Sequence, residues 1–319
     1  MSHYVKISSI APRPLHANGP LGQRDVDRMV VFWRAELAQV TPDRPDLIVL
    51  PEACDRFVGP TGAEQQAYYR LRGEQLLDLF RDVAREQRCH IACSAIRLLP
   101  DGTRRNTTQL IGRDGEIVGL YNKTHTTIGE TEESGILCGR EAPILSCDLG
   151  RVVCAICFDL NFDELRLQYA AARPDLILFS SMYHGGLMQA YWAYSCRAHF
   201  VAAVAGLPSA IISPVGHTLA TTTNYMDHVT ATVNLDCRVV HLDYNRGRLR
   251  ALKAKYGPGV TIYDPGYLAS VLLSSETEGV SVDDLMREFE IEPLDDYIAR
   301  SLAHHHDPTH VEPPNQEES

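Results

Sequence analysis

A cysteine, a glutamate and a lysine stand at the ends of predicted strands, where their side chains could carry out nucleophilic chemistry. Cys157 closes an apolar run and opens the segment Cys157-Phe158-Asp159-Leu160, which leads into a predicted helix. A sharp turn from strand to helix exposes a side chain and points backbone N–H groups into the same space. A thiol in that position could attack a carbonyl carbon. A buried structural cysteine fits the local sequence equally well.

Glu52 and Lys123 each follow a predicted strand. Glu52 comes directly after Leu50-Pro51, where partial desolvation would raise the pKa of a carboxyl group and suit it to act as a general base. Taken alone, it is also typical of the first turn of a helix. Lys123 could stabilise an oxyanion or lower the pKa of a neighbouring thiol. A lone lysine is more commonly a solvated surface residue.

The chain contains nine cysteines, and two of them, Cys154 and Cys157, form a Cys-x-x-Cys pair. Residues three apart on a strand point to opposite faces, and the sequence has no second cysteine pair with zinc-site spacing. We therefore expect neither a metal site nor a redox pair, and no cofactor. The Met1–Ile7 segment lacks the layout of a signal peptide, so reduced thiols and a cytoplasmic location are expected.

Composition narrows the class of protein. Of the 319 residues, 45% are hydrophobic and 22% are charged, which is typical of a globular protein with a large core. The formal net charge of −11 argues against general binding to nucleic acid, because an acidic surface repels phosphates. Apolar runs long enough to span a bilayer are lacking, so no membrane partner is expected.

Apolar runs and helical periodicity alternate along the chain, which predicts a layered α/β fold. Continuous apolar runs typical of strands buried on both faces occur at residues 46–50, 90–96, 151–156 and 175–179. Helical spacing of apolar residues is found at 26–40, 73–88, 165–172 and 187–204, although the end of the last range could be a strand. Asp114-Gly115 between residues 106–111 and 116–122 predicts a hairpin, so the sheet should be mixed.

The sequence also predicts how the chain is divided. We expect a catalytic domain at 1–242 and an extension at 243–302, packed on the domain or on a partner subunit. The extension should contain a helix near Val282–Phe289. Residues 303–319 are rich in His, Pro and Glu, which predicts a disordered tail.

The ordered set of motifs is similar to that of the nitrilase superfamily, the carbon–nitrogen hydrolases. Pro51-Glu52 follows a buried strand, Lys123-Thr124-His125 follows a hairpin, and Cys157-Phe158-Asp159 stands at the turn from strand to helix. The resemblance runs from about Tyr4 to about Leu242. It implies a four-layer αββα sandwich with mixed sheets and a catalytic triad of Glu52 as base, Lys123 and Cys157 as nucleophile.

The resemblance also implies a second glutamate in the loop after the lysine. That loop offers Glu130, Glu132 and Glu133, and Glu133-Ser134 best resembles the family pattern. We therefore expect Glu133 to orient the substrate or support Lys123. Asp159, two residues after the cysteine, resembles the amidase branches of the family, which favours an amide over a nitrile substrate.

The resemblance implies acyl transfer through a cysteine thioester on a small amide or N-carbamoyl compound. The backbone N–H of Phe158 would help Lys123 to hold the oxyanion. Asn161 stands where relatives commonly carry another motif, and it is expected in the substrate site. Tyr183 and His184 are predicted to line the pocket, with an exposed loop as the alternative. Nitrile hydrolysis, a glutaminase that donates ammonia and a catalytically silent binding protein remain open. We expect a homodimer or a larger homo-oligomer.

Overall fold

The computed structural model describes residues 2–313 and divides the chain into two compact units. The large unit is Tyr4–Val233, and the small unit combines Met1–His3 with Asn234–Ser319. In the part of the chain that is described, none of the helices is both long and apolar enough to cross a membrane.

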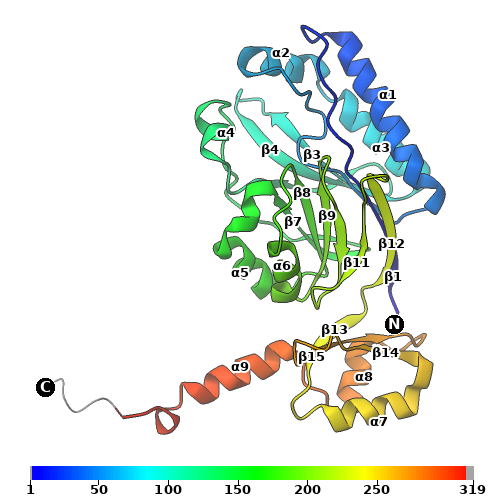
Figure 1. The fold of residues 1–319 in the computed structure, drawn as a ribbon, viewed down its shortest axis with the longest axis vertical. Helices are drawn as coiled ribbons and strands as arrows, with labels where there is room; N and C mark the ends of the chain where they lie inside the picture. The colour runs from blue at the N-terminus through cyan, green and yellow to red at the C-terminus, as the bar shows by residue number, and fades with distance from the viewer. Residues whose placement is uncertain (1, 314–319) are drawn as a thin grey trace, which may run out of the picture. The chain divides into compact units, whose positions relative to one another are not determined.

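The large unit contains two six-stranded mixed sheets (Figure 1). The first has the order β12-β1-β2-β3-β4-β5 and is built from β1 (Tyr4–Ile10), β2 (Leu47–Val49), β3 (His90–Leu98), β4 (Arg104–Ile111), β5 (Ile117–Asn122) and β12 (His228–Asn234). The second has the order β11-β10-β9-β8-β7-β6 and is built from β6 (Leu145–Cys147), β7 (Gly150–Ile156), β8 (Leu176–Ser181), β9 (His199–Val204), β10 (Ala210–Ile212) and β11 (Thr218–Thr221).

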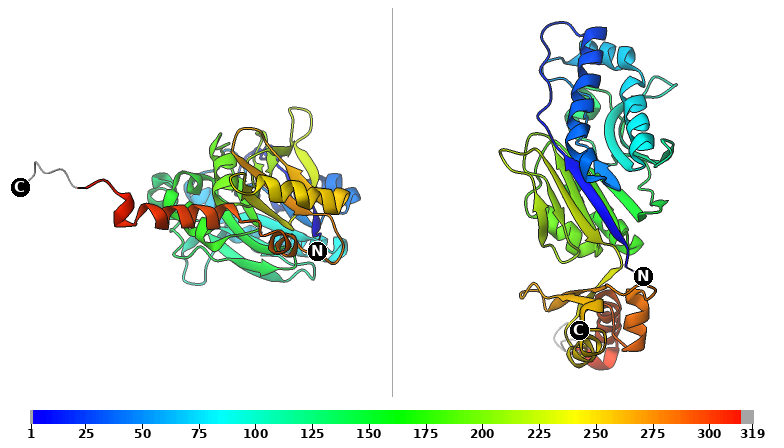
Figure 2. Two further views of the ribbon diagram at one scale, coloured as in Figure 1. Left: turned by 90° about the horizontal axis from the view of Figure 1, so that it is seen from below. Right: turned by 90° about the vertical axis from the view of Figure 1, so that its right-hand side faces the viewer.

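Helices cover the outer face of each sheet, which makes the large unit a four-layer αββα sandwich (Figures 1 and 2). The first sheet carries α1 (Gln23–Val40), α2 (Gly62–Arg72) and α3 (Gln75–Gln87), and the second carries α5 (Asp163–Ala172) and α6 (Met188–Cys196). Short helical segments are η1 (Thr41–Asp43), α4 (Ile128–Glu132) and η2 (Cys157–Asn161). The predicted α/β fold with mixed sheets is thereby confirmed.

The two sheets pack face to face through fully buried strands. Every residue of β2 and β8 is buried, as the continuous apolar runs predict, and every residue of β9 is buried too. Two hydrogen bonds join the sheets directly. The Ser180 hydroxyl donates to the Leu50 carbonyl at 2.8 Å, and the Ser9 hydroxyl donates to the Ala202 carbonyl at 2.7 Å. The first bond holds the ends of β2 and β8 beside each other, and the second joins β1 to β9.

The small unit has a core of its own, formed around the antiparallel sheet β13-β15-β14. Its elements are β13 (Cys237–His241), α7 (Arg246–Tyr256), η3 (Gly257–Gly259), β14 (Val260–Tyr263), β15 (Ser270–Ser275), α8 (Val282–Glu288), α9 (Leu294–His305) and η4 (Pro308–His310). The division falls at Val233/Asn234, so β13 belongs to the small unit and not to the 1–242 domain that the sequence predicts. The start of the predicted disordered tail, residues 303–305, is helical. Residues 314–319 lie outside the described range.

Candidate active site

The carboxyl ends of β2 and β7 bring the predicted glutamate and cysteine to one edge of the sandwich. Glu52 follows β2, Lys123 follows β5, and Cys157 follows β7. All three line a cavity of about 240 Å³ within the large unit. The structure therefore places the three predicted catalytic residues together, although each comes from a different strand.

Cys157 stands at a turn that its own backbone makes unusual. Its φ angle is +50°, a left-handed conformation that residues other than glycine seldom adopt. The strand β7 ends at Ile156, and the 3₁₀ turn η2 begins at Cys157 before α5 follows. This geometry lifts the thiol out of the strand and into the cavity. The other member of the Cys-x-x-Cys pair, Cys154, is buried within β7.

Lys123 is a buried ammonium group held between two carboxylates. Its Nζ donates to Glu52 Oε1 at 3.0 Å and to Glu130 Oε2 at 2.8 Å, and only 1% of its side chain is exposed. Burial lowers the pKa of Lys123, but the two carboxylates raise it by more, so the net shift is upward. The lysine is therefore a fixed positive charge beside Cys157.

The second glutamate of the site is Glu130, and not the predicted Glu133. A capping box at the start of α4 holds Glu130 in place, because its carboxylate accepts from the backbone N–H of Thr127 at 2.8 Å. Burial raises the pKa of Glu130, but Lys123 lowers it by more, so the net shift is downward. Glu133 follows the last residue of α4, and its side chain is exposed.

Asn106 is a second donor that both carboxylates share with Lys123. Its Nδ2 donates to Glu52 Oε1 at 2.8 Å and to Glu130 Oε1 at 3.1 Å. The sequence analysis did not single out this residue. The available signal was a polar residue on a buried strand of the predicted hairpin, since Asn106 lies in β4 and is 2% exposed.

The thiol of Cys157 is neutral in the free site. Burial and then the Glu52 carboxylate raise its pKa, Lys123 and a hydrogen bond from the Met182 backbone N–H lower it, and the net result is a pKa of about 12. Lys123 does lower the pKa of the thiol, as the sequence suggested, but burial and Glu52 raise that pKa by more. Glu52 is hydrogen-bonded to this thiol and can accept its proton.

Asp159 anchors the cysteine turn to the loop that carries Lys123. Its fully buried carboxylate accepts from the backbone N–H of Ile156 at 2.8 Å, from that of His125 at 2.9 Å and from the Tyr121 hydroxyl at 2.7 Å. The hydrogen bond with Asp159 raises the pKa of His125, and a second one with Glu164 adds to the rise. The sequence used Asp159 only to favour an amide substrate, whereas the structure shows that it positions the turn.

The four predicted substrate-binding residues lie around the cysteine turn but do not line the cavity that holds the triad. Phe158 is 36% exposed, and its carbonyl accepts from Asn161 Nδ2 at 3.0 Å. Burial raises the pKa of Tyr183, and the neighbouring Cys157 adds to this shift. His184 Nδ1 accepts from the backbone N–H of Gly186 at 3.1 Å. Met182, just before Tyr183, lines the cavity instead.

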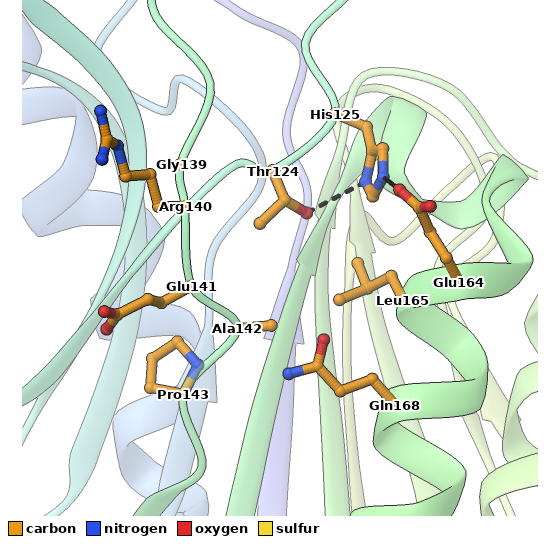
Figure 3. A pocket seen from close by; sticks show the side chains of 10 residues that line it. All are labelled: Thr124, His125, Gly139, Arg140, Glu141, Ala142, Pro143, Glu164, Leu165 and Gln168. Carbon is orange, nitrogen blue, oxygen red and sulfur yellow. Dashed lines mark hydrogen bonds and ion pairs between the residues drawn. The ribbon is translucent and has the colours of Figure 1, made fainter.

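A second, larger cavity of about 680 Å³ lies beside the loop after β5 (Figure 3). It is bounded by Thr124 and His125, by residues 139–143 and by the α5 side chains Glu164, Leu165 and Gln168. The dashed bonds in Figure 3 join His125 to Thr124 and to Glu164. This cavity shares no lining residue with the one that holds Cys157, so the nucleophile does not open into it.

One group of side chains has the composition of a metal site. Donor atoms of His90, Cys147 and Asp148 lie within 4.8 Å of one another, at the amino ends of β3 and β7 and so at the opposite edge from Cys157. Asp148 also accepts from Arg113 Nε at 2.7 Å. That guanidinium group already neutralises the carboxylate and would repel a cation, so the cluster is better explained as an ion-pair network.

We expect the Glu130→Gln variant to lower kcat on an amide substrate by about ten- to a hundredfold, because Lys123 loses one of its two charged partners. Glutamine still offers an oxygen to the Thr127 N–H, so the start of α4 should persist. The matched control is Glu133→Gln, which removes an exposed carboxylate of the same loop and should stay within twofold of the parent. Steady-state kinetics of both variants test this assignment, and a larger loss for Glu133→Gln would reverse it.

Comparison with known proteins places the chain among carbon-nitrogen hydrolases. Over 171 residues the chain is 28% identical to the Homo sapiens protein named deaminated glutathione amidase, covering 49% of this chain and 51% of that protein. The chain thus spans about half the length of the curated relatives it matches.

Solved structures show the same fold at low sequence identity. The C. elegans NitFhit protein superposes with a TM-score of 0.64 and 15% identity, covering 90% of this chain and 98% of that one. An amidase from Nesterenkonia sp. superposes with a TM-score of 0.59 and 18% identity, covering 79% and 96%. The family model for carbon-nitrogen hydrolases matches residues 24–285. The chain therefore belongs to the carbon-nitrogen hydrolase family.

Proposed function

We propose that the protein hydrolyses the carbon–nitrogen bond of a small amide or N-carbamoyl compound through a thioester on Cys157. The observation that carries this proposal is the Lys123 ammonium group, buried between Glu52 and Glu130 in the same cavity as a thiol held at a positive φ angle. The named amidases among the relatives support an amide substrate.

The proposed reaction begins with a proton transfer. Because the Cys157 thiol is neutral in the free site, Glu52 takes its proton as the sulfur attacks the carbonyl carbon. Lys123 and the backbone N–H of Phe158 stabilise the oxyanion that forms. A single donor of this kind contributes about 3 kcal/mol to transition-state stabilisation.

The leaving group and the water complete the cycle. Glu52 passes its proton to the departing nitrogen, and ammonia or an amine leaves behind a thioester between Cys157 and the acyl group. Water then attacks the thioester carbon while Glu52 accepts its proton, which releases the acid and restores the thiol. Glu130 and Asn106 act as positioning residues, because they hold Lys123 and Glu52 in register.

The direct test is intact-protein mass spectrometry after incubation with a panel of small amides, N-carbamoyl compounds, nitriles and glutamine. We expect a mass increase on the Cys157 peptide that equals the acyl group, together with release of ammonia or amine. Turnover of nitriles alone, or of glutamine alone, would replace the proposed substrate class. Turnover without any Cys157 adduct, even after rapid acid quenching, would contradict the covalent route.

We also propose that the protein is at least a dimer. The side chains of Leu167 on α5, Leu187 just before α6 and Tyr191 on α6 are 56%, 79% and 43% exposed, whereas Leu165 and Tyr169 are buried inside the unit. Light scattering at micromolar concentration should give a mass of at least twice 35.5 kDa. The variant Leu167→Glu should shift that mass towards a single chain, and a wild-type mass near 35.5 kDa would overturn the proposal.

A further inference from the structure

Arg56 lines the cavity that contains Cys157, and its guanidinium group has no acidic partner there. The residue is exposed and lies in the loop between β2 and α2. Among residues 2–313, no carboxylate forms an ion pair with it, and no side-chain hydrogen bond engages it. A guanidinium group at the rim of the cavity that has no acidic partner can bind an anionic group of a ligand through its N–H donors.

The carboxylate next to Arg56 in the sequence and the two that line the cavity are bound by other residues. Its neighbour Asp55 is buried and forms an ion pair with Arg72 at 2.7 Å. Glu52 and Glu130, which line the same cavity, are held by Lys123 and Asn106. Among the described residues that line the cavity, Arg56 is thus the cation without an acidic partner, and its charge is available to a ligand.

The loop that carries Arg56 is fixed by buried contacts. The Cys54 N–H donates to the Ser94 carbonyl at 2.9 Å, and Trp33 Nε1 donates to the Cys54 carbonyl at 2.7 Å. The Arg56 N–H donates to the Ala53 carbonyl at 2.8 Å and closes the turn. The backbone of Arg56 is therefore held in place before a ligand arrives, which lowers the entropic loss on binding.

A second guanidinium group lies on the same side of the cavity. Arg104 lines a small recess of about 60 Å³ that shares Tyr69 and Ile96 with the catalytic cavity. Burial and then Asp55 raise the pKa of Tyr69, whereas the charges of Arg56 and Arg104 oppose the rise. Both guanidinium groups thus act on the same hydroxyl and offset part of the effect of Asp55.

Resting on the proposed function, we propose that the substrate carries a carboxylate, which Arg56 binds while the scissile carbonyl carbon lies against Cys157. The cavity has a volume of about 240 Å³. This is below the range of roughly 300–1,000 Å³ that holds drug-sized ligands, so the chain between the two groups is short. The carboxylate can belong to the acyl half, as in the monoamide of a dicarboxylic acid, or to the amine half, as in an N-carbamoyl amino acid.

Two matched pairs of compounds test the carboxylate, since each pair differs by a methyl group in its place. Glutaramate is compared with pentanamide, and N-carbamoyl-β-alanine with propylurea. Binding is measured by calorimetry to the full-length Cys157→Ala variant, which cannot turn the compounds over. We expect the carboxylate member of at least one pair to bind about ten- to a hundredfold more tightly than its methyl partner, and the pair that shows this identifies the half of the substrate that carries the charge.

The variant Arg56→Gln, in the same Cys157→Ala background, should reduce that ratio of affinities to within about twofold of one. Arg56→Lys should keep part of the ratio, because it retains the charge but not the planar fork. The matched control is Arg34→Gln, which removes an exposed arginine of α1 outside the cavity and should keep the whole ratio. Equal binding within both pairs, no binding of any of the four compounds, or a preference that survives Arg56→Gln would overturn the inference.

Turnover by the wild-type protein separates this inference from the proposed function. Carboxylate-selective binding that depends on Arg56, with no hydrolysis of any compound, would refute the hydrolase and leave the carboxylate site standing. Hydrolysis with equal kcat/KM for the two members of each pair would do the reverse.

Discussion

Replacing Cys157 with alanine should reduce turnover of the best amide substrate by about 10⁴-fold or more, because the covalent step is lost while binding remains. The serine variant should be almost as inactive, since Glu52 would have to deprotonate a far less acidic hydroxyl. Neither change adds volume to the turn. Both residues can adopt the +50° φ angle about as readily as cysteine, so the fold should persist.

The measurement is ammonia or amine release alongside tryptophan fluorescence. The matched control is Cys138→Ser, which changes an exposed thiol outside the cavity and should leave turnover within twofold of the parent. A Cys157→Ala protein with native fluorescence and a wild-type rate would remove Cys157 from the mechanism.

Replacing Lys123 with methionine should both inactivate and destabilise the large unit. The change leaves Glu52 and Glu130 facing each other with Asn106 as their shared donor, while 99% of the lysine side-chain surface is buried in the parent. Removing one partner of a buried ionic group lowers the free energy of unfolding by about 3–5 kcal/mol. Denaturant unfolding followed by tryptophan emission reports on this unit, because Trp33 and Trp192 both lie within it.

The loss of stability in the Lys123→Met variant should depend on pH. The folded pKa of Glu130 is lowered in the parent, so its contribution to stability is present above the unfolded pKa of about 4.5 and is lost as the pH falls through the folded value. The difference in the free energy of unfolding between the parent and the Lys123→Met variant should therefore become smaller at acidic pH. The double variant Lys123→Met/Glu130→Gln should recover part of the stability at neutral pH. A difference in the free energy of unfolding that stays constant from pH 7 to well below pH 4, where Glu130 becomes protonated, would show that electrostatics is not its cause.

The buried strands and the turn at Cys157 could be predicted because their signals are local. Continuous apolar runs at 46–50 and 175–179 correspond to β2 and β8, and the Asp-Gly hairpin corresponds to β4 and β5. The 187–204 range is split between α6 and β9, as the alternative for its end allows. Periodicity could not place the break at residues 197–198, because apolar residues continue across it.

The choice between Glu130 and Glu133 needed tertiary information. Motif resemblance selects a neighbour of serine, whereas the capping box at Thr127 decides which carboxylate turns towards Lys123. Asn106 was missed for a similar reason, since other polar residues share its position in the predicted hairpin and the sequence does not show which of them reaches Glu52 and Glu130. The sequence placed the boundary after residue 242 and not at Val233/Asn234, because the pairing of β13 with β15, far along the chain, leaves no local signal.

The proposed base and nucleophile lie on opposite sheets of the sandwich, and the Ser180–Leu50 bond between those sheets joins residues 130 positions apart in the chain. No contiguous fragment that forms only one sheet can therefore assemble the site. During refolding, catalytic activity should appear only with the last cooperative event that docks the two halves, after the hairpin and the local helices have formed. The recovery of activity during refolding thus reports when the two sheets dock. In the Ser180→Ala variant, activity should recover later relative to the helical circular dichroism signal.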